Sequence, residues 1–98
     1  MNVSAVMIVK NGAQTIRKTL ESLRKFDDVV VYDNGSSDGT QEIAREYPNV
    51  HLIEGNFDGF GTTKNRAASY AKYDWILIID SDEVVDTRLL KYPTNQNT

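Results

Sequence analysis

The chain has 98 residues with 40% hydrophobic content, 11 basic and 14 acidic residues, and no cysteine. This length suits one domain with one modest core, the lack of cysteine excludes disulfides and thiolate-bound zinc, and a net charge of −3 without a basic stripe argues against nucleic acid as a partner. No apolar run approaches the roughly 20 residues that span a bilayer, and the first residues do not resemble a signal peptide. We therefore expect a cytoplasmic protein, with the inner face of the membrane as the alternative for a longer protein that contains this chain.

The first predicted element is a strand over Val3–Val9, a short and almost continuous apolar run. A helix is expected next, because apolar residues recur there at helical spacing: Ile16, Leu20 and Leu23. Asn11 and Gln14 stand where a capping box would place the N-cap and its reciprocal partner.

A second strand is predicted over 29–32 and a third over 50–53, both rich in β-branched residues. The segment between them predicts a second helix that Asp38 opens and Pro48 ends.

A third helix is predicted with Thr62 or Thr63 as its cap and with small residues on its inner face: Ala67, Ala68 and Ala71. A fourth strand is predicted over 75–79 and reads, like the others, as a strand that is covered on both faces. The segment 92–98 has no periodicity, so we expect one domain over 1–91 and a disordered tail over 92–98.

This alternation, β-α-β-α-β-α-β, predicts an α/β fold with a mostly parallel sheet and helices on both faces, one half of a Rossmann-like fold. With the strand order 3-2-1-4, ligands are expected outside the carboxyl ends of the strands, where the order reverses between the first and fourth strands. Three polar segments would meet there: Lys10-Asn11, residues 33–35 and residues 80–82.

Asp80 and Asp82 follow the fourth strand directly, and in an extended segment residues two apart project to the same side. Two close carboxylates repel each other unless a cation neutralises them, and all-oxygen ligation suits Mg²⁺ or Mn²⁺ rather than zinc. The alternative is an ordinary polar turn. His51, the only histidine, is expected to be a plain strand residue.

The segment 33–40 allows two further hypotheses, and both fail. A calcium loop starting at Asn34 would need a glutamate at its twelfth position, where Arg45 stands. A dinucleotide site would pair Asp33 with a glycine-rich turn after the first strand, and that turn has only one glycine. Turn and cap roles account for Ser36, Ser37 and Asp38, which leaves Asp33 as a candidate for binding.

A glycine-rich segment, 55–61, leads into the third predicted helix, whose first turns carry Lys64 and Arg66. Such a helix start can receive an anion such as a diphosphate. The alternative is that Lys64 lies on a solvated helix face.

Taken in order, residues 5–11, 33–40, 55–56 with 64–65, and 80–83 resemble the motifs of the family 2 glycosyltransferases with a GT-A fold. The resemblance implies that Asp33 bonds a uracil ring, that Asp80 lies near the ribose and the metal, and that Asp82 ligates a metal that bridges the diphosphate. A nucleotide sugar, most simply a UDP-sugar, would be bound by Val9, Lys10, Asn11, Asp33, Gly35, Lys64, Asp80 and Ser81, and a divalent Mg²⁺ or Mn²⁺ by Asp82 and Asp80.

The same resemblance implies transfer of a hexose to a saccharide acceptor in the synthesis of cell-surface polysaccharide or lipopolysaccharide. Lys10-Asn11, in place of the more common Pro-Thr or Pro-Ser, is similar to the subgroup that adds glucose to lipopolysaccharide core sugars. In the family the catalytic base lies well downstream. No catalytic residue is therefore expected in this chain, and the base and the acceptor-binding half would lie beyond residue 98.

Two alternatives remain open at this point. The segment 78–84 is also similar to the first motif of haloacid-dehalogenase-type phosphatases, although little chain follows it here. A non-catalytic nucleotide-binding module would bind the same ligand without transferring the sugar. Because the apolar run 75–79 would lie near an unpaired sheet edge, we also expect a tendency to dimerise through that edge.

Overall fold

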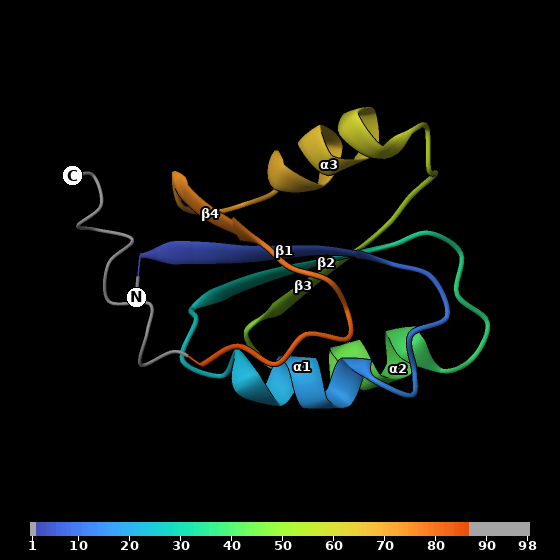
Figure 1. Ribbon diagram of the computed structural model, residues 1–98, viewed down its shortest axis with the longest axis horizontal. Helices are drawn as coiled ribbons and strands as arrows, with labels where there is room; N and C mark the ends of the chain where they lie inside the picture. Colours follow the sequence, from blue (N-terminus) through green and yellow to red (C-terminus); the bar gives the residue numbers. More distant parts are fainter. Residues whose placement is uncertain (1, 87–98) are drawn as a thin grey trace.

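The computed structural model describes residues 2–86 and contains the seven elements in the predicted order (Figure 1). The predictions for 92–98 and for the last residues of the 1–91 domain lie outside this range. The elements are β1 (Val3–Val9), α1 (Ile16–Ser22), β2 (Asp28–Asp33), α2 (Thr40–Arg45), β3 (Val50–Glu54), α3 (Phe60–Ala68) and β4 (Trp75–Ile78).

The four strands form one parallel sheet in the order β3-β2-β1-β4, which confirms the predicted topology. β2 and β3 are added on one side of β1, and β4 is added on its other side, so the strand order reverses at β1. Val9 at the end of β1 pairs with Asp33 at the end of β2, whereas pairing between β1 and β4 stops at Val6 and Ile78. The loops after β1 and β2 therefore begin side by side, and the chain leaves β4 earlier along β1.

Helices cover both faces of the sheet, with α1 and α2 on one side and α3 on the other (Figure 1). The larger core cluster lies on the α1 and α2 side and includes Met7, Leu20 and Val31, while Val6, Tyr32 and Ala67 are among the residues of the smaller cluster under α3. All six residues of β2 are buried. Burial on both faces explains why this strand reads as a continuous apolar run.

The helices begin at other residues than the capping patterns predicted. α1 begins at Ile16 with Thr15 as its N-cap, and Asn11, with a φ of 57°, is part of the preceding loop. α2 begins at Thr40, although Asp38 does accept a hydrogen bond from the Thr40 amide at 3.1 Å. α3 begins at Phe60, before either predicted threonine cap.

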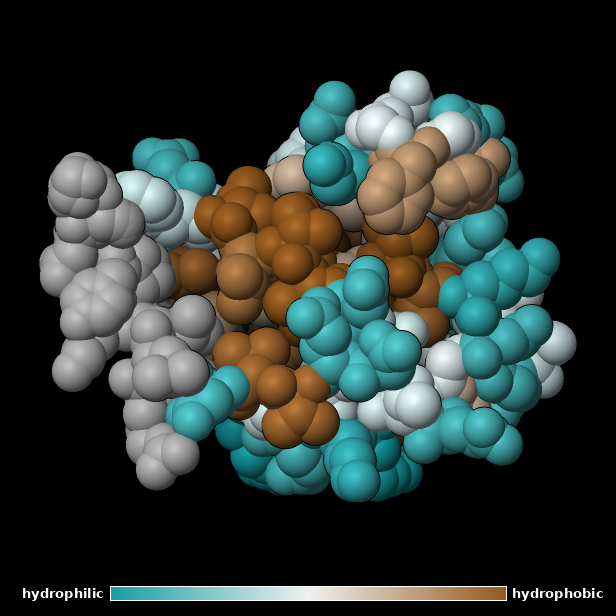
Figure 2. Space-filling view, in the orientation of Figure 1, coloured by the Kyte–Doolittle hydropathy of each residue, from teal (hydrophilic) through white to brown (hydrophobic). Residues whose placement is uncertain are grey.

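The expectation that the fourth strand is covered on both faces is wrong. β4 lies at the edge of the sheet, and its side chains Trp75, Ile76 and Ile78 are 46%, 38% and 43% exposed. Only one face is packed, since Leu77 and Ile79 join the larger core cluster. α3 contacts β1 and β2, and the open face of β4 forms a brown apolar area in Figure 2.

Among residues 2–86, no helix is long and apolar enough to cross a membrane.

Candidate functional site

The loops that follow β1 and β2 are joined by reciprocal hydrogen bonds. The Asn11 amide donates to Ser36 Oγ at 2.7 Å, and the Ser37 amide donates back to Asn11 Oδ1 at 2.8 Å. The Asn34 amide also donates to the Val9 carbonyl at 2.8 Å. Asn11 adopts the left-handed conformation, which asparagine tolerates better than most residues. Its side chain is therefore used to hold two loops together rather than to cap a helix.

Two further contacts tie the β1 loop to the start of α2. The Gly12 amide donates to Thr40 Oγ1 at 2.9 Å, and the Ala13 amide donates to Asp38 Oδ2 at 3.0 Å. Asp38 also accepts a short hydrogen bond from the Thr40 hydroxyl. The hydrogen bonds from Thr40 and from the Ala13 amide hold the pKa of Asp38 below its ordinary value, because they favour the charged carboxylate.

Asp33 is fully buried and holds the β2 loop in shape. Its Oδ2 accepts hydrogen bonds from the Ser36 amide at 2.9 Å, the Gly35 amide at 3.2 Å and Gln41 Nε2 at 2.6 Å, and its Oδ1 accepts one from the Ser36 hydroxyl. A carboxylate offers about four acceptor positions, two on each oxygen, and here three donors share Oδ2 while one bonds to Oδ1. The predicted contact of Asp33 with a uracil ring stays a prediction.

Asp80 and Asp82 lie in a tight turn, so the predicted extended geometry is wrong. The Glu83 amide donates to the Asp80 carbonyl at 3.1 Å, and Glu83 Oε1 accepts from the Asp80 amide at 2.6 Å. Glu83, to which the sequence assigned no role, closes the turn from both ends. The turn places the two aspartates at its first and third positions, and they no longer share one side of a strand by pleat geometry.

The turn is fixed to α1 through a single carbonyl. Ser81 O accepts from Thr15 Oγ1 and from Thr19 Oγ1, both at 2.9 Å, and Thr19 is fully buried. A Cβ on Gly12 would lie 2.6 Å from Val9 Cγ2 and 3.2 Å from Ser81 Oγ. A side chain at position 12 would therefore collide with Val9 and crowd Ser81, so Gly12 suits the close approach of the β1 loop to the β4 turn. The three loops therefore meet, as the topology predicts.

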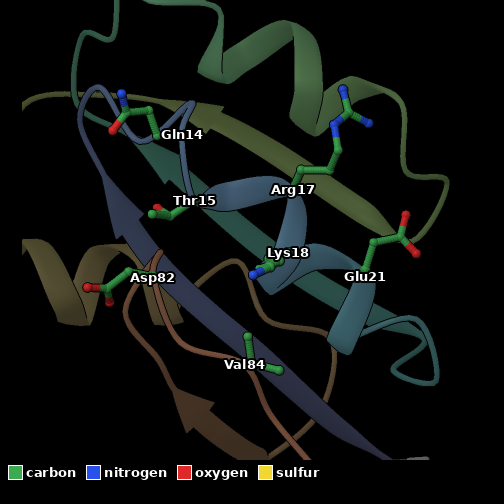
Figure 3. A pocket seen from close by; sticks show the side chains of 7 residues that line it. All are labelled: Gln14, Thr15, Arg17, Lys18, Glu21, Asp82 and Val84. Carbon is green, nitrogen blue, oxygen red and sulfur yellow. The ribbon is translucent and has the colours of Figure 1, made fainter.

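Both aspartates of the turn are exposed. Asp82 lies on a groove of about 650 Å³ whose opposite side is α1, and Lys18 extends toward it from that helix (Figure 3). Within residues 2–86 no group of three or more His, Cys, Asp or Glu residues is placed to hold a metal. Two carboxylates completed by water and phosphate oxygens are the kind of site that Mg²⁺ uses, so the residues fit a nucleotide-bound cation better than a protein-only cage.

The glycine loop, defined here as residues 55–59, runs from β3 to α3. Lys64 in α3 is half-buried, and its ammonium has no hydrogen-bond or ion-pair partner within residues 2–86. Arg66, two residues later, instead contacts the loop itself, and its hydrogen bonds to Tyr32 and Asp58 raise its pKa above the ordinary arginine value. Of the two cations of α3, Lys64 is thus the one without a partner in the described chain, and Arg66 has a different role.

The sequence analysis did not find Thr15 or Thr19 as parts of this region, and it gave neither the loop contacts of Arg66 nor the turn contact of Glu83. Thr15 and Thr19 contact Ser81 more than 60 positions away along the chain, and no local pattern signals such a contact. The acidic residue three positions after Asp80 was a signal for Glu83, since a side chain at that spacing can close a turn.

A family model described as glycosyl transferase family 2 matches residues 4–92. The chain belongs to this family. The match leaves the phosphatase alternative without support. Relatives include a TPR repeat-containing protein of Synechococcus elongatus, 38% identical over 82 residues, and the poly(ribitol-phosphate) beta-N-acetylglucosaminyltransferase TarS of Staphylococcus aureus, 32% identical over 102 residues.

The family 2 chain spans a small part of these relatives. It aligns over 83% of its own length with 20% of the Synechococcus protein, and over 93% of its length with 18% of TarS. The structure of TarS residues 1–349 in complex with UDP superposes with a TM-score of 0.83 at 30% identity, covering 96% of this chain and 31% of that one.

A second solved structure shows the same fold at lower identity. Glucosyl-3-phosphoglycerate synthase of Mycobacterium tuberculosis, in complex with Mn²⁺, UDP and glucosyl-3-phosphoglycerate, superposes with a TM-score of 0.69 at 21% identity. It covers 87% of this chain and 34% of that one. The GT-A type of fold that the sequence predicted is thereby confirmed.

Proposed function

We propose that this chain is the nucleotide-sugar-binding part of a glycosyltransferase that transfers a hexose from a UDP-sugar to a saccharide acceptor. The observation that supports this best is the meeting of the β1 loop, the β2 loop and the Asp80–Glu83 turn at the reversal point of the sheet. This is where a Rossmann-like sheet binds ligands. TarS, which shares this fold at 30% identity, was solved with UDP.

The chemistry of the leaving group gives the charged residues their roles. Glycosyl transfer expels a nucleoside diphosphate, so negative charge develops on the leaving phosphate oxygen and must be stabilised. A divalent cation, Mg²⁺ or Mn²⁺, supplies that stabilisation when it is bound. Asp80 and Asp82 would hold the cation, and the ammonium of Lys64, which has no partner in the described chain, would approach the diphosphate.

We assign the uridine side of the ligand to the β1 and β2 loops. Val9, Lys10 and Asn11 line one loop, and Asp33 and Gly35 shape the other. Their hydrogen bonds hold both loops in place before any ligand arrives, which lowers the ordering cost of binding. Ser81 belongs to the turn that meets these loops.

The residues that bind the acceptor and remove its proton are proposed to lie outside this chain. Inverting transfer requires a general base that accepts the proton of the acceptor hydroxyl. We assign this role to none of the described residues. The relatives are several times longer, so their remaining length can hold an acceptor site. We expect the 98-residue chain to bind the nucleotide without transferring sugar, in the cytoplasm or at the inner face of the membrane.

We further propose a role in making cell-surface polysaccharide or lipopolysaccharide. TarS is named for a polymeric acceptor, poly(ribitol-phosphate), and the Lys10-Asn11 pair is similar to the lipopolysaccharide glucosyltransferase subgroup. Sugar transfer by a longer protein that contains this chain would separate the transferase from a non-catalytic nucleotide-binding module.

Titration of the chain with UDP, with and without Mn²⁺, tests the proposed site. We expect Mn²⁺ to tighten UDP binding at least about tenfold, and Asp82→Ala to remove that gain without unfolding the chain, because Asp82 is exposed. Asp74→Ala, an exposed aspartate just before β4, is the matched control and should bind as the wild type does. A UDP affinity that changes neither with Mn²⁺ nor with Asp82→Ala would contradict the proposed metal site.

A further inference from the structure

One nitrogen of Arg66 contacts three acceptors from different parts of the chain. Arg66 Nη1 donates to Asp58 Oδ2 at 2.8 Å, to the Asn56 carbonyl at 3.2 Å and to the Tyr32 hydroxyl at 3.3 Å. Arg66 lies in α3, Asn56 and Asp58 in the glycine loop, and Tyr32 in β2. A single side chain therefore joins the helix, the loop that leads into it and the sheet beneath.

Tyr32 provides a rigid base for this contact. Its side chain is 1% exposed, and its hydroxyl donates to the Asn56 carbonyl at 2.8 Å while it accepts from Arg66. A Cβ on Gly55 would lie 2.2 Å from that hydroxyl oxygen, so no other residue fits there without moving the loop or the tyrosine. The ring of Tyr32 thus fixes where the loop leaves the sheet.

The loop is also held at its ends by backbone amides. The Gly55 amide donates to the Asp33 carbonyl at 3.0 Å, and the Asp58 amide donates to Thr63 Oγ1 at 2.8 Å. The Thr63 amide in turn donates to the Gly59 carbonyl at 3.0 Å. Without the Arg66 contacts, the middle of the loop would keep the Tyr32 hydrogen bond to the Asn56 carbonyl and the ring contact between Phe57 and Phe60, in a segment that contains two glycines.

We propose that Arg66 is a positioning residue of the nucleotide site. Its hydrogen bonds hold the glycine loop against Tyr32 and thereby fix the position of the first turns of α3 and the direction of Lys64. This rests on the proposed function, in which Lys64 meets the diphosphate. The three acceptors engage Nη1 of Arg66, and the guanidinium contacts no ligand in this proposal. Its effect is to pay the ordering cost of the loop before the nucleotide binds.

The three contacts are not expected to matter equally. The ion pair with Asp58 is solvent-exposed, with side chains that are 37% and 53% exposed, and pairs of this kind contribute little. The bonds to the buried Tyr32 hydroxyl and to the Asn56 carbonyl fix the backbone. Removing Asp58 should therefore change little, whereas removing the cation should release the loop.

Two readouts on the whole chain test the proposal: hydrogen exchange of the loop amides without ligand, and UDP affinity in the presence of Mn²⁺. We expect Arg66→Gln to speed exchange in the glycine loop and to weaken UDP binding, each about tenfold, which corresponds to the ordering cost of about one backbone residue. Arg66→Lys should restore most of both, since a lysine ammonium has three donors for the three acceptors.

Two further variants complete the design. Arg45→Gln removes the exposed Arg45–Glu54 ion pair of 3.6 Å and should leave both readouts unchanged. Tyr32→Phe removes one hydroxyl and keeps the buried ring, so it should give an intermediate loss and serves in place of Arg66→Gln if that variant does not fold.

Each contrary outcome has its own meaning. A loop that opens in Arg66→Gln while UDP affinity stays unchanged would overturn the positioning role. If Arg66→Lys exchanges its loop amides as fast and binds UDP as weakly as Arg66→Gln, then the contacts of a cation with the three acceptors do not hold the loop. A wild-type chain that does not bind UDP would overturn the proposed function and the effect on binding, and the exchange measurements would still decide whether Arg66 holds the loop.

Discussion

The carboxyl ends of β1 and β2 differ from the edge strand β4 in how much of their surface is buried and hydrogen-bonded within the chain. β2 is buried along its whole length, and the polar groups at its end are paired with the β1 loop. β4 comes from an equally apolar run, yet one of its faces is open and its outer edge has no strand beside it within residues 2–86. The loops after β1 and β2 are therefore held in place before a ligand binds. The open face of β4 stays exposed to solvent unless another surface packs on it.

The largest expected effect comes from breaking the paired region at Asp33. Asp33→Ala removes a fully buried carboxylate and leaves the Gly35 amide and the half-buried donors of Ser36 and Gln41 without their acceptor. Because several donors lose their acceptor at once, we expect the free energy of unfolding to fall by about 3 kcal/mol. Urea denaturation followed by circular dichroism measures this loss.

Glu54→Ala is the matched control, because Glu54 ends the neighbouring strand β3 in register with Asp33. Glu54 is exposed, and its pairing with Arg45 at 3.6 Å is a surface contact. Its removal should change the free energy of unfolding by less than about 0.5 kcal/mol. Equal losses in the two variants would show that the loop network contributes nothing beyond a surface charge.

The sequence predicted the parallel sheet and its order because β-branched runs alternate with helical spacing, and these patterns are local. It could not distinguish β4 from β2, since an apolar run looks the same at the edge and in the centre. The predicted strand order placed this run at the sheet edge, but it did not show that α3 packs on β1 and β2 and leaves one face of β4 open. The residue types of 75–79 therefore predicted the strand but not its exposure.

The candidate site was predicted in part for the same reason. The topology brought the three loops together as expected, because parallel strands place their carboxyl ends along one edge. The geometry within the loops was not predicted. Asn11 bonds to Ser37 rather than capping α1, because a contact between distant segments outweighs the local capping preference. Glu83 instead closes a local turn at Asp80, where a side-chain contact to the backbone replaces the extended conformation.

A smaller loss of stability is expected when acid protonates Asp38, whose carboxylate helps to join the β1 loop to the start of α2. The pKa of Asp38 is lowered in the folded chain by Thr40 and the Ala13 amide, so the folded state binds its proton less readily than the unfolded chain does. The stabilisation is therefore complete above the ordinary aspartate pKa, about 3.9, and is lost as the pH falls through the lower folded value.

Comparison with Asp38→Asn isolates this contribution. We expect the wild type to be more stable than the variant at pH 6 and the difference to shrink steadily below about pH 4. Thermal unfolding of both proteins across this range measures the difference. A gap that stays constant with pH would mean that the charge of Asp38 does not contribute to holding the two segments.

The smallest effect on stability, but the clearest on association, is expected at the open face of β4. We propose that a second copy of the chain pairs with this edge, because an unpaired strand with exposed apolar side chains favours strand addition. Ile78→Lys places a charge there on a side chain that is already 43% exposed. It should change the free energy of unfolding by less than about 1 kcal/mol and abolish association.

Light scattering during size-exclusion chromatography, over a range of concentrations, tests this pairing. Val84→Lys is the matched control, since Val84 is 65% exposed and apolar but lies after β4 rather than on its edge. The control should associate as the wild type does. A wild type that stays monomeric at high concentration would show that the exposed apolar face alone does not drive pairing between copies, and that covering β4 requires a partner other than a second copy.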